Sequence, residues 1–265
     1  MDKLISSVQN PFVKRALHLQ KKRERGRKSQ FLIEGYKELS SAVDASYSIE
    51  VLFFCADLAH AEFRVLLNRL AALGTKLLCC HEPLFRKISY RDNPDGFLAI
   101  AECRFPSLDT LSVTPTSFFL IAERIEKPGN LGAILRSADA AGAKAVIVVD
   151  ECIDIYNPNV VRASVGALFS IPTISAEKED VFRWLRKNHI TTIAATPEAK
   201  VSYMDLQIRK SCAFVVGGEH EGLSFFWKEN ADCSVKIPMI GKVDSLNVAT
   251  TATLLLFEAK RWMNL

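Results

Sequence analysis

Continuous apolar runs, separated by segments with helical spacing, dominate the second half of the chain. Runs without polar alternation are typical of strands that are covered on both faces. The expected strands lie at 117–123, 145–150, 191–196, 212–218 and 234–238. The expected helices lie at 130–143, within 157–170, around 181–189, after residue 218 and from residue 245 almost to the end. This alternation predicts an α/β domain with a mostly parallel sheet and helices on both sides.

The first half of the chain shows the same alternation on a smaller scale. Residues 58–74 carry apolar positions at helical spacing and end at Gly74, a natural helix stop. Strands are expected within 31–35, 49–56, 75–81 and 96–105, with further helices within 36–45 and 82–89. The pattern predicts a small α/β domain over residues 1–105. Residues 106–116 are rich in Pro, Ser and Thr and are expected to link it to a second domain at 117–265.

The last ribbon of the chain places a polar cluster in front of an apolar helix. A short strand, Val235 to Ile237, is expected to stop at Pro238, which has no N–H for a ladder hydrogen bond. Ser245 is then the expected N-cap of the final helix, with Asn247 in its first turn. A loop followed by a helix start is suited to holding a ligand. A plain cap before a packing helix is about equally probable on this stretch alone.

Composition indicates a soluble globular protein of 265 residues, with 49% hydrophobic and 24% charged residues. No run reaches the apolar length of a membrane span, and the first residues lack the apolar stretch of a signal peptide, so a cytoplasmic protein is expected. The seven cysteines form no CxxC pair and the five histidines have no metal-ligand spacing. We therefore expect no metal, and we interpret the cysteines as small buried hydrophobes.

Positive charge is concentrated near the beginning of the chain, although the net charge is only +4. Residues 10–30 contain a dense group of lysines and arginines with Glu24 as the nearest acid. Such a group favours contact with a phosphate backbone over a plain solvated helix face by about two to one. The predicted RNA-binding side chains are Lys14, Lys21, Lys22, Arg23, Arg25 and Arg27.

Polar or glycine-rich segments follow four of the expected strands, where ligands bind in parallel sheets. The first segment carries Asn130, expected as an N-cap, and Arg136. The second carries Thr196 and Pro197. The third carries Gly217, Gly218 and Glu219, and the fourth is Ser245, Leu246 and Asn247. The glycine spacing is not the dinucleotide fingerprint, and no GK[ST] sequence forms a P-loop.

Three of these segments together resemble a known family. NLGAILRSADAAGA, VVGGEHEGL and IPMIGKVDSLNVATTA occur in the order of the three motifs of the SpoU (TrmH-type) RNA ribose methyltransferases of the SPOUT superfamily. The opening SSVQNPFVKRALHLQKKRERGRKSQFLIEG resembles the substrate-binding domain that often precedes that catalytic domain. The resemblance covers nearly the whole chain.

The resemblance implies a C-terminal domain tied in a deep trefoil knot, S-adenosylmethionine as cofactor, an RNA substrate and a homodimer. The implied cofactor-binding residues are Thr196, Pro197, Gly217, Gly218, Ile237, Met239 and Leu246. The implied catalytic residues are Arg136 with Asn130, Glu219, Ser245 and Asn247 around the methyl-accepting ribose. Because a guanidinium seldom releases its proton, we expect Arg136 to hold a phosphate and to stabilise negative charge on the ribose oxygen.

The leading hypothesis is therefore an S-adenosylmethionine-dependent RNA 2′-O-ribose methyltransferase. Ribosomal RNA is preferred over transfer RNA because a separate basic domain suits a folded RNA segment. Two alternatives stay open: a catalytically inactive RNA-binding protein on the same scaffold, and an ordinary nucleotide-binding enzyme.

Overall fold

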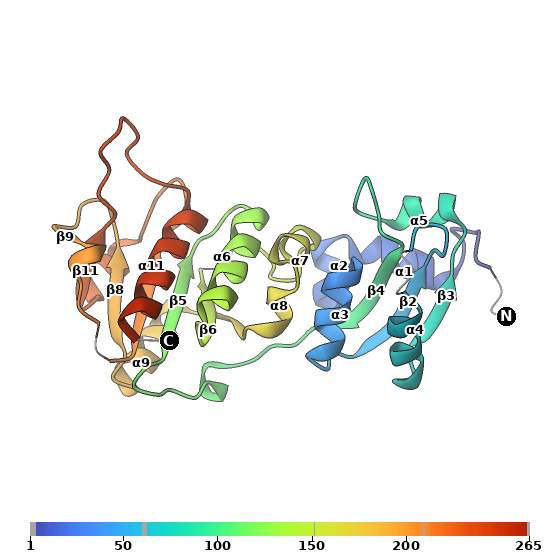
Figure 1. The fold of residues 1–265 in the computed structure, drawn as a ribbon, viewed down its shortest axis with the longest axis horizontal. Coiled ribbons are helices and arrows are strands. Elements are labelled where there is room, and N and C mark those ends of the chain that lie inside the picture. The colour runs from blue at the N-terminus through green and yellow to red at the C-terminus, as the bar shows by residue number, and fades with distance from the viewer. Residues whose placement is uncertain (1–3, 60–62, 151, 209, 264–265) are drawn as a thin grey trace. The chain divides into compact units, whose positions relative to one another are not determined.

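The computed structural model describes residues 4–59, 63–150, 152–208 and 210–263. The chain forms two compact units (Figure 1). The first comprises the chain up to Arg104 together with Asp154–Ser170, and the second comprises Phe105–Ile153 and Ile171–Leu265. The domain boundary at 106–116 that the sequence predicts stays a prediction. Residues 154–170 follow that expected linker in sequence but belong to the first unit.

The first unit is built on a mixed four-stranded sheet of order β1-β4-β2-β3. β4 pairs antiparallel with both β1 and β2, and β2 pairs parallel with β3. The strands are β1 (Gln30–Glu34), β2 (Ile49–Phe54), β3 (Lys76–Cys79) and β4 (Phe97–Glu102). β2, β3 and β4 lie within the runs that the sequence predicts as strands, and β1 begins one residue before its predicted run.

Helices cover both faces of this sheet. They are α1 (Pro11–Leu19), α2 (Lys22–Lys28), α3 (Tyr36–Asp44), α4 (Phe63–Ala72), α5 (Glu82–Ile88), α7 (Pro158–Ser164) and α8 (Ala167–Ser170). The described part of the helix expected at 58–74 begins at Phe63, and residues 60–62 lie outside the described residues. The helix expected within 157–170 is two helices, because Val165 and Gly166 both adopt positive φ, 51° and 95°.

An aromatic cluster attaches the segment 154–170 to the first unit. The ring of Phe31 on β1 lies 4.3 Å from that of Tyr156 and 6.3 Å from that of Phe169. Tyr47 packs edge-on against Phe169 at 5.1 Å. Since large aromatic rings bury much apolar surface, this cluster explains why a segment distant in sequence belongs to this unit.

One of the predicted RNA-binding residues is a structural residue instead. Arg25 is only 3% exposed, and its Nε donates to Asp154 at 2.6 Å. Its Nη1 donates to the carbonyl oxygens of Leu19 and Gln20, each at 2.9 Å. The prediction that Arg25 contacts RNA is therefore wrong. Only a partner on the distant segment 154–170 makes burial of this guanidinium tolerable, and the sequence pattern does not reveal that partner.

Replacing Arg25 should destabilise the protein. Arg25→Ala leaves Asp154 without its charge partner, and breaking a buried pair costs about 3 kcal/mol or more. We expect the free energy of unfolding, measured by denaturant titration, to fall by about that amount. Lys22→Ala, at an exposed position on the same helix, should change it by less than about 0.5 kcal/mol. Equal stability of the two variants would contradict the structural role.

The second unit is built on a seven-stranded sheet of order β7-β6-β5-β10-β8-β11-β9. Every recorded pair in it is parallel. The strands are β5 (Phe118–Glu123), β6 (Ala145–Val149), β7 (Thr173–Ala176), β8 (Thr191–Ala195), β9 (Val201–Ser202), β10 (Cys212–Val216) and β11 (Cys233–Lys236). The two edge strands, β7 and β9, are short and were not predicted.

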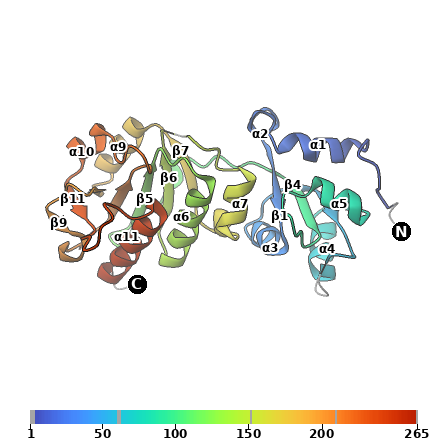
Figure 2. The ribbon, with the colours of Figure 1, turned by 90° about the horizontal axis from the view of Figure 1, so that it is seen from above.

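Helices lie on both sides of this sheet (Figure 2). Trp184 of α9 and Trp227 of α10 are buried against strand residues such as Phe119 and Val215 on one side. On the other side α6 and α11 pack together, and Ser137 hydrogen-bonds to Thr253 at 2.6 Å. These helices are α6 (Pro128–Ala141), α9 (Lys178–Lys187), α10 (Phe225–Asn230) and α11 (Val248–Met263), with single 3-10 turns at Leu108–Thr110 and Tyr203–Asp205. The predicted α/β class is confirmed. The knot stays a prediction.

Two helix starts differ from the sequence expectation. α6 begins at Pro128, so Asn130 lies inside its first turn and is not its N-cap. α11 begins at Val248, three residues after Ser245. Asn247 caps it, because the Asn247 side chain accepts from the N–H of Ala249 at 2.9 Å. The loop in front of α11 is therefore longer than predicted.

No helix in the described part of the chain is long and apolar enough to cross a membrane. All seven cysteines are free, and burial raises the pKa of Cys80 and of Cys212 to about 12. Cys152 is exposed, contrary to the interpretation of the cysteines as buried hydrophobes. Within the described ranges, no group of three His, Cys, Asp or Glu side chains could hold a metal ion.

Candidate active site

A cavity of about 980 Å³ lies at the carboxyl ends of β8, β10 and β11 in the second unit. It is hereafter called the cofactor pocket, after the cofactor that the sequence resemblance implies. Its wall is formed by the turn after β8, the glycine-rich turn after β10, the loop after β11 and the start of α11. Figure 1 shows the loop between β11 and α11 projecting beyond both elements. All the residues that the sequence predicts to bind the cofactor line this cavity, namely Thr196, Pro197, Gly217, Gly218, Ile237, Met239 and Leu246.

The glycines after β10 are needed for the packing of the chain against itself. A Cβ at Gly217 would lie 2.2 Å from the carbonyl carbon of Gly222, and one at Gly218 would lie 2.4 Å from the carbonyl oxygen of Arg124. Gly222 adopts a φ of 63°. Protein backbone thus occupies the space that a side chain at Gly217 or Gly218 would need. The glycines shape the wall of the pocket.

A side chain at Gly217 should therefore damage the cofactor pocket. Gly217→Ala places a Cβ against backbone atoms of Gly222 and Leu223 that cannot move independently, so the turn must shift. We expect the affinity for S-adenosylmethionine, measured by calorimetry, to fall by about tenfold or more, a change of about 1.4 kcal/mol. Gly26→Ala, on a helix of the first unit with nothing within 4 Å of its added Cβ, is the matched control. Equal cofactor affinity of both variants would contradict this view of the turn.

Three of the predicted catalytic residues form a hydrogen-bonded cluster beside the pocket, here called the acceptor cluster. Asn247 Nδ2 donates to Asn130 Oδ1 at 3.1 Å, and Asn130 Nδ2 donates to Glu219 Oε1. The three residues come from the start of α11, the first turn of α6 and the turn after β10. Glu219 Oε2 is buried and has no hydrogen-bond partner among the described residues. The cluster therefore ends in a carboxylate oxygen that is ready to accept a hydrogen bond.

The other two predicted catalytic residues lie outside this cluster. Ser245 lines the pocket from the exposed loop before α11. Arg136 is exposed on α6, and it does not line the pocket. No interaction within the described part of the chain links the Arg136 guanidinium to Asn130, Glu219 or Asn247. The sequence prediction that these residues share one site stays a prediction for Arg136.

The SpoU rRNA methylase family matches residues 117–257, which include the pocket and the acceptor cluster. The chain belongs to this family. An MRM3-like substrate-binding domain matches residues 10–99 in the first unit. The family membership predicted from the three sequence motifs is confirmed.

Individual relatives agree with the family match. A 23S rRNA (uridine(2479)-2′-O)-methyltransferase of Streptomyces viridochromogenes is 29% identical over 90% of this chain and 85% of its own. The AdoMet-bound structure of an rRNA methyltransferase from Sinorhizobium meliloti aligns with a TM-score of 0.90 and 32% identity, over 98% of this chain and 97% of that chain. A solved RNA 2′-O ribose methyltransferase aligns with a TM-score of 0.87 and 40% identity, over 99% of this chain and all of that one.

This SpoU-family chain is an S-adenosylmethionine-dependent RNA 2′-O-ribose methyltransferase, as predicted. Its pocket fits that cofactor chemically. Ile237, Met239 and Leu246 line the pocket outside helices and strands, so their backbone groups would be available to a bound cofactor. The carboxylates of Glu198 and Glu219 suit the positive sulfonium and ammonium groups. A hydrogen bond from the Thr196 hydroxyl lowers the pKa of Glu198, which keeps that carboxylate charged.

Charged residues at the end of β5 and just after it hold the glycine-rich turn of this family member, and the sequence pattern did not reveal them. Glu123 is fully buried and accepts from the backbone N–H of Ser224 at 2.7 Å. Arg124 pairs with Glu221 at 2.5 Å, and Glu126 pairs with His220 at 2.9 Å. The signal available in the sequence was the run Glu-Arg-Ile-Glu immediately after an apolar strand. A charged residue that ends a fully buried strand requires a partner on a neighbouring loop.

Proposed function

We propose that this enzyme methylates the 2′-hydroxyl of a ribose in ribosomal RNA, in the cytoplasm. The observation that carries the proposal is the acceptor cluster, which places the unpartnered carboxylate oxygen of Glu219 beside the cofactor pocket. The ribosomal substrate is supported by the names of the relatives with full-length similarity.

The residues of the chain perform the following roles in this proposal. The bound cofactor supplies an activated methyl group on its sulfonium sulfur. Glu219 accepts a hydrogen bond from the ribose 2′-hydroxyl and takes its proton as the oxygen–methyl bond forms and the carbon–sulfur bond breaks. Asn247 donates to Asn130, and Asn130 donates to Glu219. The two amides therefore hold the Glu219 carboxylate in one orientation.

Arg136 acts on the RNA in this proposal. A guanidinium has a pKa above about 12, so it holds its proton and serves as a fixed positive charge. Arg136 has no ion-pair partner among the described residues, which leaves its donors available for a phosphate next to the reacting ribose. Ser245, on the exposed loop, contacts the same nucleotide.

The basic helices of the first unit supply the general attraction for RNA. Lys14 on α1, Lys21 before α2, and Lys22, Arg23 and Arg27 on α2 are all exposed. Arg27 also pairs with Glu24 at 2.7 Å, an exposed contact that a phosphate can replace. Arg25 is excluded from this set by its burial.

A homodimer formed through the second unit is part of the same proposal. Helices α6 and α11 pack side by side, and Phe257 on α11 remains 44% exposed. A second copy that covers this helix pair would bury Phe257 and enclose Arg136. Sedimentation equilibrium would test this, since a monomer at micromolar concentration contradicts it.

A labelling experiment tests the reaction and the substrate class together. The protein is incubated with methyl-tritiated S-adenosylmethionine and either unmodified ribosomal RNA or unmodified transfer RNA. Label in ribosomal RNA that is recovered as an alkali-resistant dinucleotide is the expected result, because 2′-O-methylation blocks alkaline cleavage. Label in transfer RNA alone would overturn the substrate class, and alkali-labile label would overturn the 2′-hydroxyl as acceptor.

A further inference from the structure

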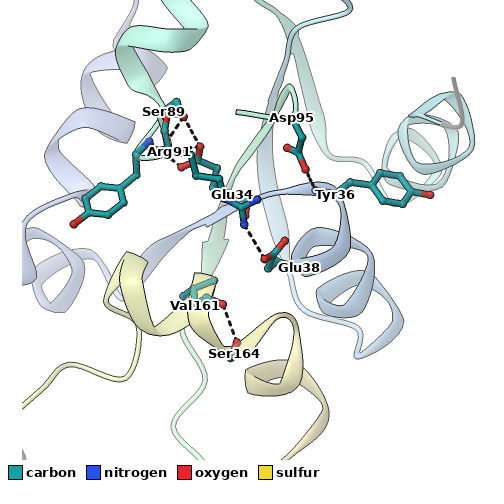
Figure 3. A network of polar contacts seen from close by, with 9 residues as sticks. Glu34, Tyr36, Glu38, Ser89, Arg91, Asp95, Val161 and Ser164 are labelled. Atoms are coloured by element: carbon teal, nitrogen blue, oxygen red, sulfur yellow. Dashed lines mark hydrogen bonds and ion pairs between the residues drawn. The ribbon is translucent and has the colours of Figure 1, made fainter. Parts of the chain in front are cut away.

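A network of buried charges in the first unit fixes the loop 89–95, which is hereafter called the Tyr90 loop (Figure 3). Glu34, at the end of β1, is 8% exposed and Glu38, on α3, is 4% exposed. Glu34 accepts from the backbone N–H of Tyr90 at 2.8 Å, and also from the N–H of Arg91 and the hydroxyl of Ser89. The Arg91 guanidinium donates to Glu38 at 2.7 Å and to the carbonyl oxygen of Glu34 at 2.9 Å.

The backbone around this network is specialised as well. Gly35 adopts a φ of 111°, and a Cβ there would lie 2.3 Å from the Glu38 carboxylate and 2.7 Å from the Arg91 guanidinium. Asp95 accepts from the N–H of Tyr36 at 2.8 Å, which closes the far end of the loop. Burying carboxylates is costly unless their hydrogen bonds are satisfied. Most of these bonds hold one short loop in one conformation.

The side chain that this loop presents is an exposed aromatic ring. Tyr90 is 44% exposed, although its backbone N–H is held by a buried carboxylate. Its hydroxyl accepts a hydrogen bond from Asn159 of α7 at 2.9 Å, which fixes the ring as well. A rigid, exposed aromatic ring offers a flat surface on which a nucleic-acid base can stack at little entropic cost.

The surroundings of Tyr90 carry positive charge. Arg162 of α7 is exposed, has no ion-pair partner among the described residues and lines the same small depression as Tyr90. Lys87, in the last turn of α5, is exposed three residues before Tyr90. Of the two acids in the loop, Asp95 is held by the Tyr36 N–H and Asp92 is exposed. A ring beside an exposed arginine matches an unpaired nucleotide, with its base on the ring and its phosphate at the guanidinium.

We infer that Tyr90 is a base-stacking residue for an unpaired nucleotide of the substrate RNA, with Arg162 as its phosphate contact. This surface is assembled from the Tyr90 loop and from α7. The basic start of α2 lies nearby, since Gln20 donates to the carbonyl oxygen of Ile88 at 3.3 Å. The inference rests on the proposed function, since it assumes an RNA substrate. It assigns the buried Glu34 network the task of positioning the ring before RNA binds.

Two substitutions at Tyr90 test the inference with the full-length protein and a labelled, unmodified 23S ribosomal RNA transcript in filter binding. Tyr90→Ala removes the ring but keeps the backbone N–H that Glu34 holds, so the loop should stay in place. We expect the RNA affinity to fall by roughly 5- to 150-fold, the effect of losing one base–aromatic stack. Tyr90→Phe retains the stacking surface and should bind close to wild type. Val65→Ala, at an exposed apolar position on α4, is the matched control.

The salt dependence separates the two contacts. Tyr90→Ala should leave the slope of log affinity against log salt unchanged, because stacking releases no counterions. Arg162→Ala should lower that slope by about one. Ultraviolet cross-linking of wild-type protein to the transcript should attach RNA to the peptide that contains Tyr90.

Several results would overturn the inference. One such result is an RNA affinity of Tyr90→Ala equal to that of Val65→Ala. Another is a loss of RNA affinity in Tyr90→Phe as large as that in Tyr90→Ala, which would point to the hydroxyl and its bond to Asn159. Cofactor affinity and melting temperature measured in parallel identify a variant that is merely misfolded, and in that case the cross-link alone decides. Failure of the wild-type protein to label any RNA would count against the proposed function, whereas labelling with a neutral Tyr90→Ala counts only against this inference.

Discussion

Arg136→Lys should lose nearly all methyl transfer while its cofactor affinity stays at the wild-type value. Lysine keeps the charge but lacks the planar fork that binds a phosphate through two parallel hydrogen bonds. Loss of one group that stabilises charge in the transition state lowers kcat by roughly 10²- to 10³-fold. Since Arg136 does not line the cofactor pocket, calorimetric binding of S-adenosylmethionine should not change.

The control for this prediction is Arg183→Lys. Arg183 is an exposed arginine on α9, across the sheet from α6, and its partner is Asp180 in the same helix. Its replacement should leave both turnover and cofactor binding unchanged. Weaker cofactor binding by Arg136→Lys would indicate that Arg136 supports the structure of the site. Full turnover would remove Arg136 from the mechanism.

Glu219→Gln should be the second severe variant. The amide has nearly the same shape as the carboxylate, so the side chain can still meet Asn130, but it cannot take a proton. Removing a positioned general base costs roughly 10²- to 10⁴-fold in kcat. Single-turnover measurement of labelled ribosomal RNA gives the chemical step directly. Glu229→Gln, on the exposed face of α10, is the matched control and should behave as wild type.

A comparison of Glu219→Gln with Asn130→Ala separates proton transfer from positioning. Loss of Asn130 frees the Glu219 carboxylate to rotate but leaves it able to accept a proton, so turnover should fall less than in Glu219→Gln. Retention of more than about a tenth of the wild-type rate by Glu219→Gln would contradict its role as the base. Water or another group would then have to accept the proton.

The local pattern of the chain was sufficient for most of the elements and for the family, although it missed the edge strands β7 and β9. Apolar runs at 118–122 and 212–216 form central strands, as predicted, because strands covered on both faces require continuous apolar sequence. The glycine-rich turn and the SLN segment were identified as motifs, and both line the cofactor pocket. Helix starts were predicted less well. A capping residue such as Asn247 is identified by the backbone N–H group that donates to its side chain, and that contact is visible only in the structure.

The partners of charged residues could not be predicted from the pattern. Arg25 lies in a basic run that favours solvent exposure, yet it is buried against Asp154, which lies far away in sequence. Glu34 and Glu38 lie in an ordinary strand–helix unit, and only the returning loop with Arg91 makes their burial acceptable. A side chain's environment depends on which segment folds over it, and periodicity carries no information about that segment.

By itself, the sequence determined the α/β class, most of the strands and their order along the chain, the three motifs and hence the family. The tertiary structure alone decided that β10 lies between β5 and β8, which brings the exits of distant strands around one pocket. It also decided that Glu219 meets Asn130 and Asn247, and that α7 presents Asn159 to Tyr90. The physical reason is that hydrophobic periodicity reports the face that each element buries. The neighbour on that face is chosen by strand pairing and packing between segments far apart in the chain.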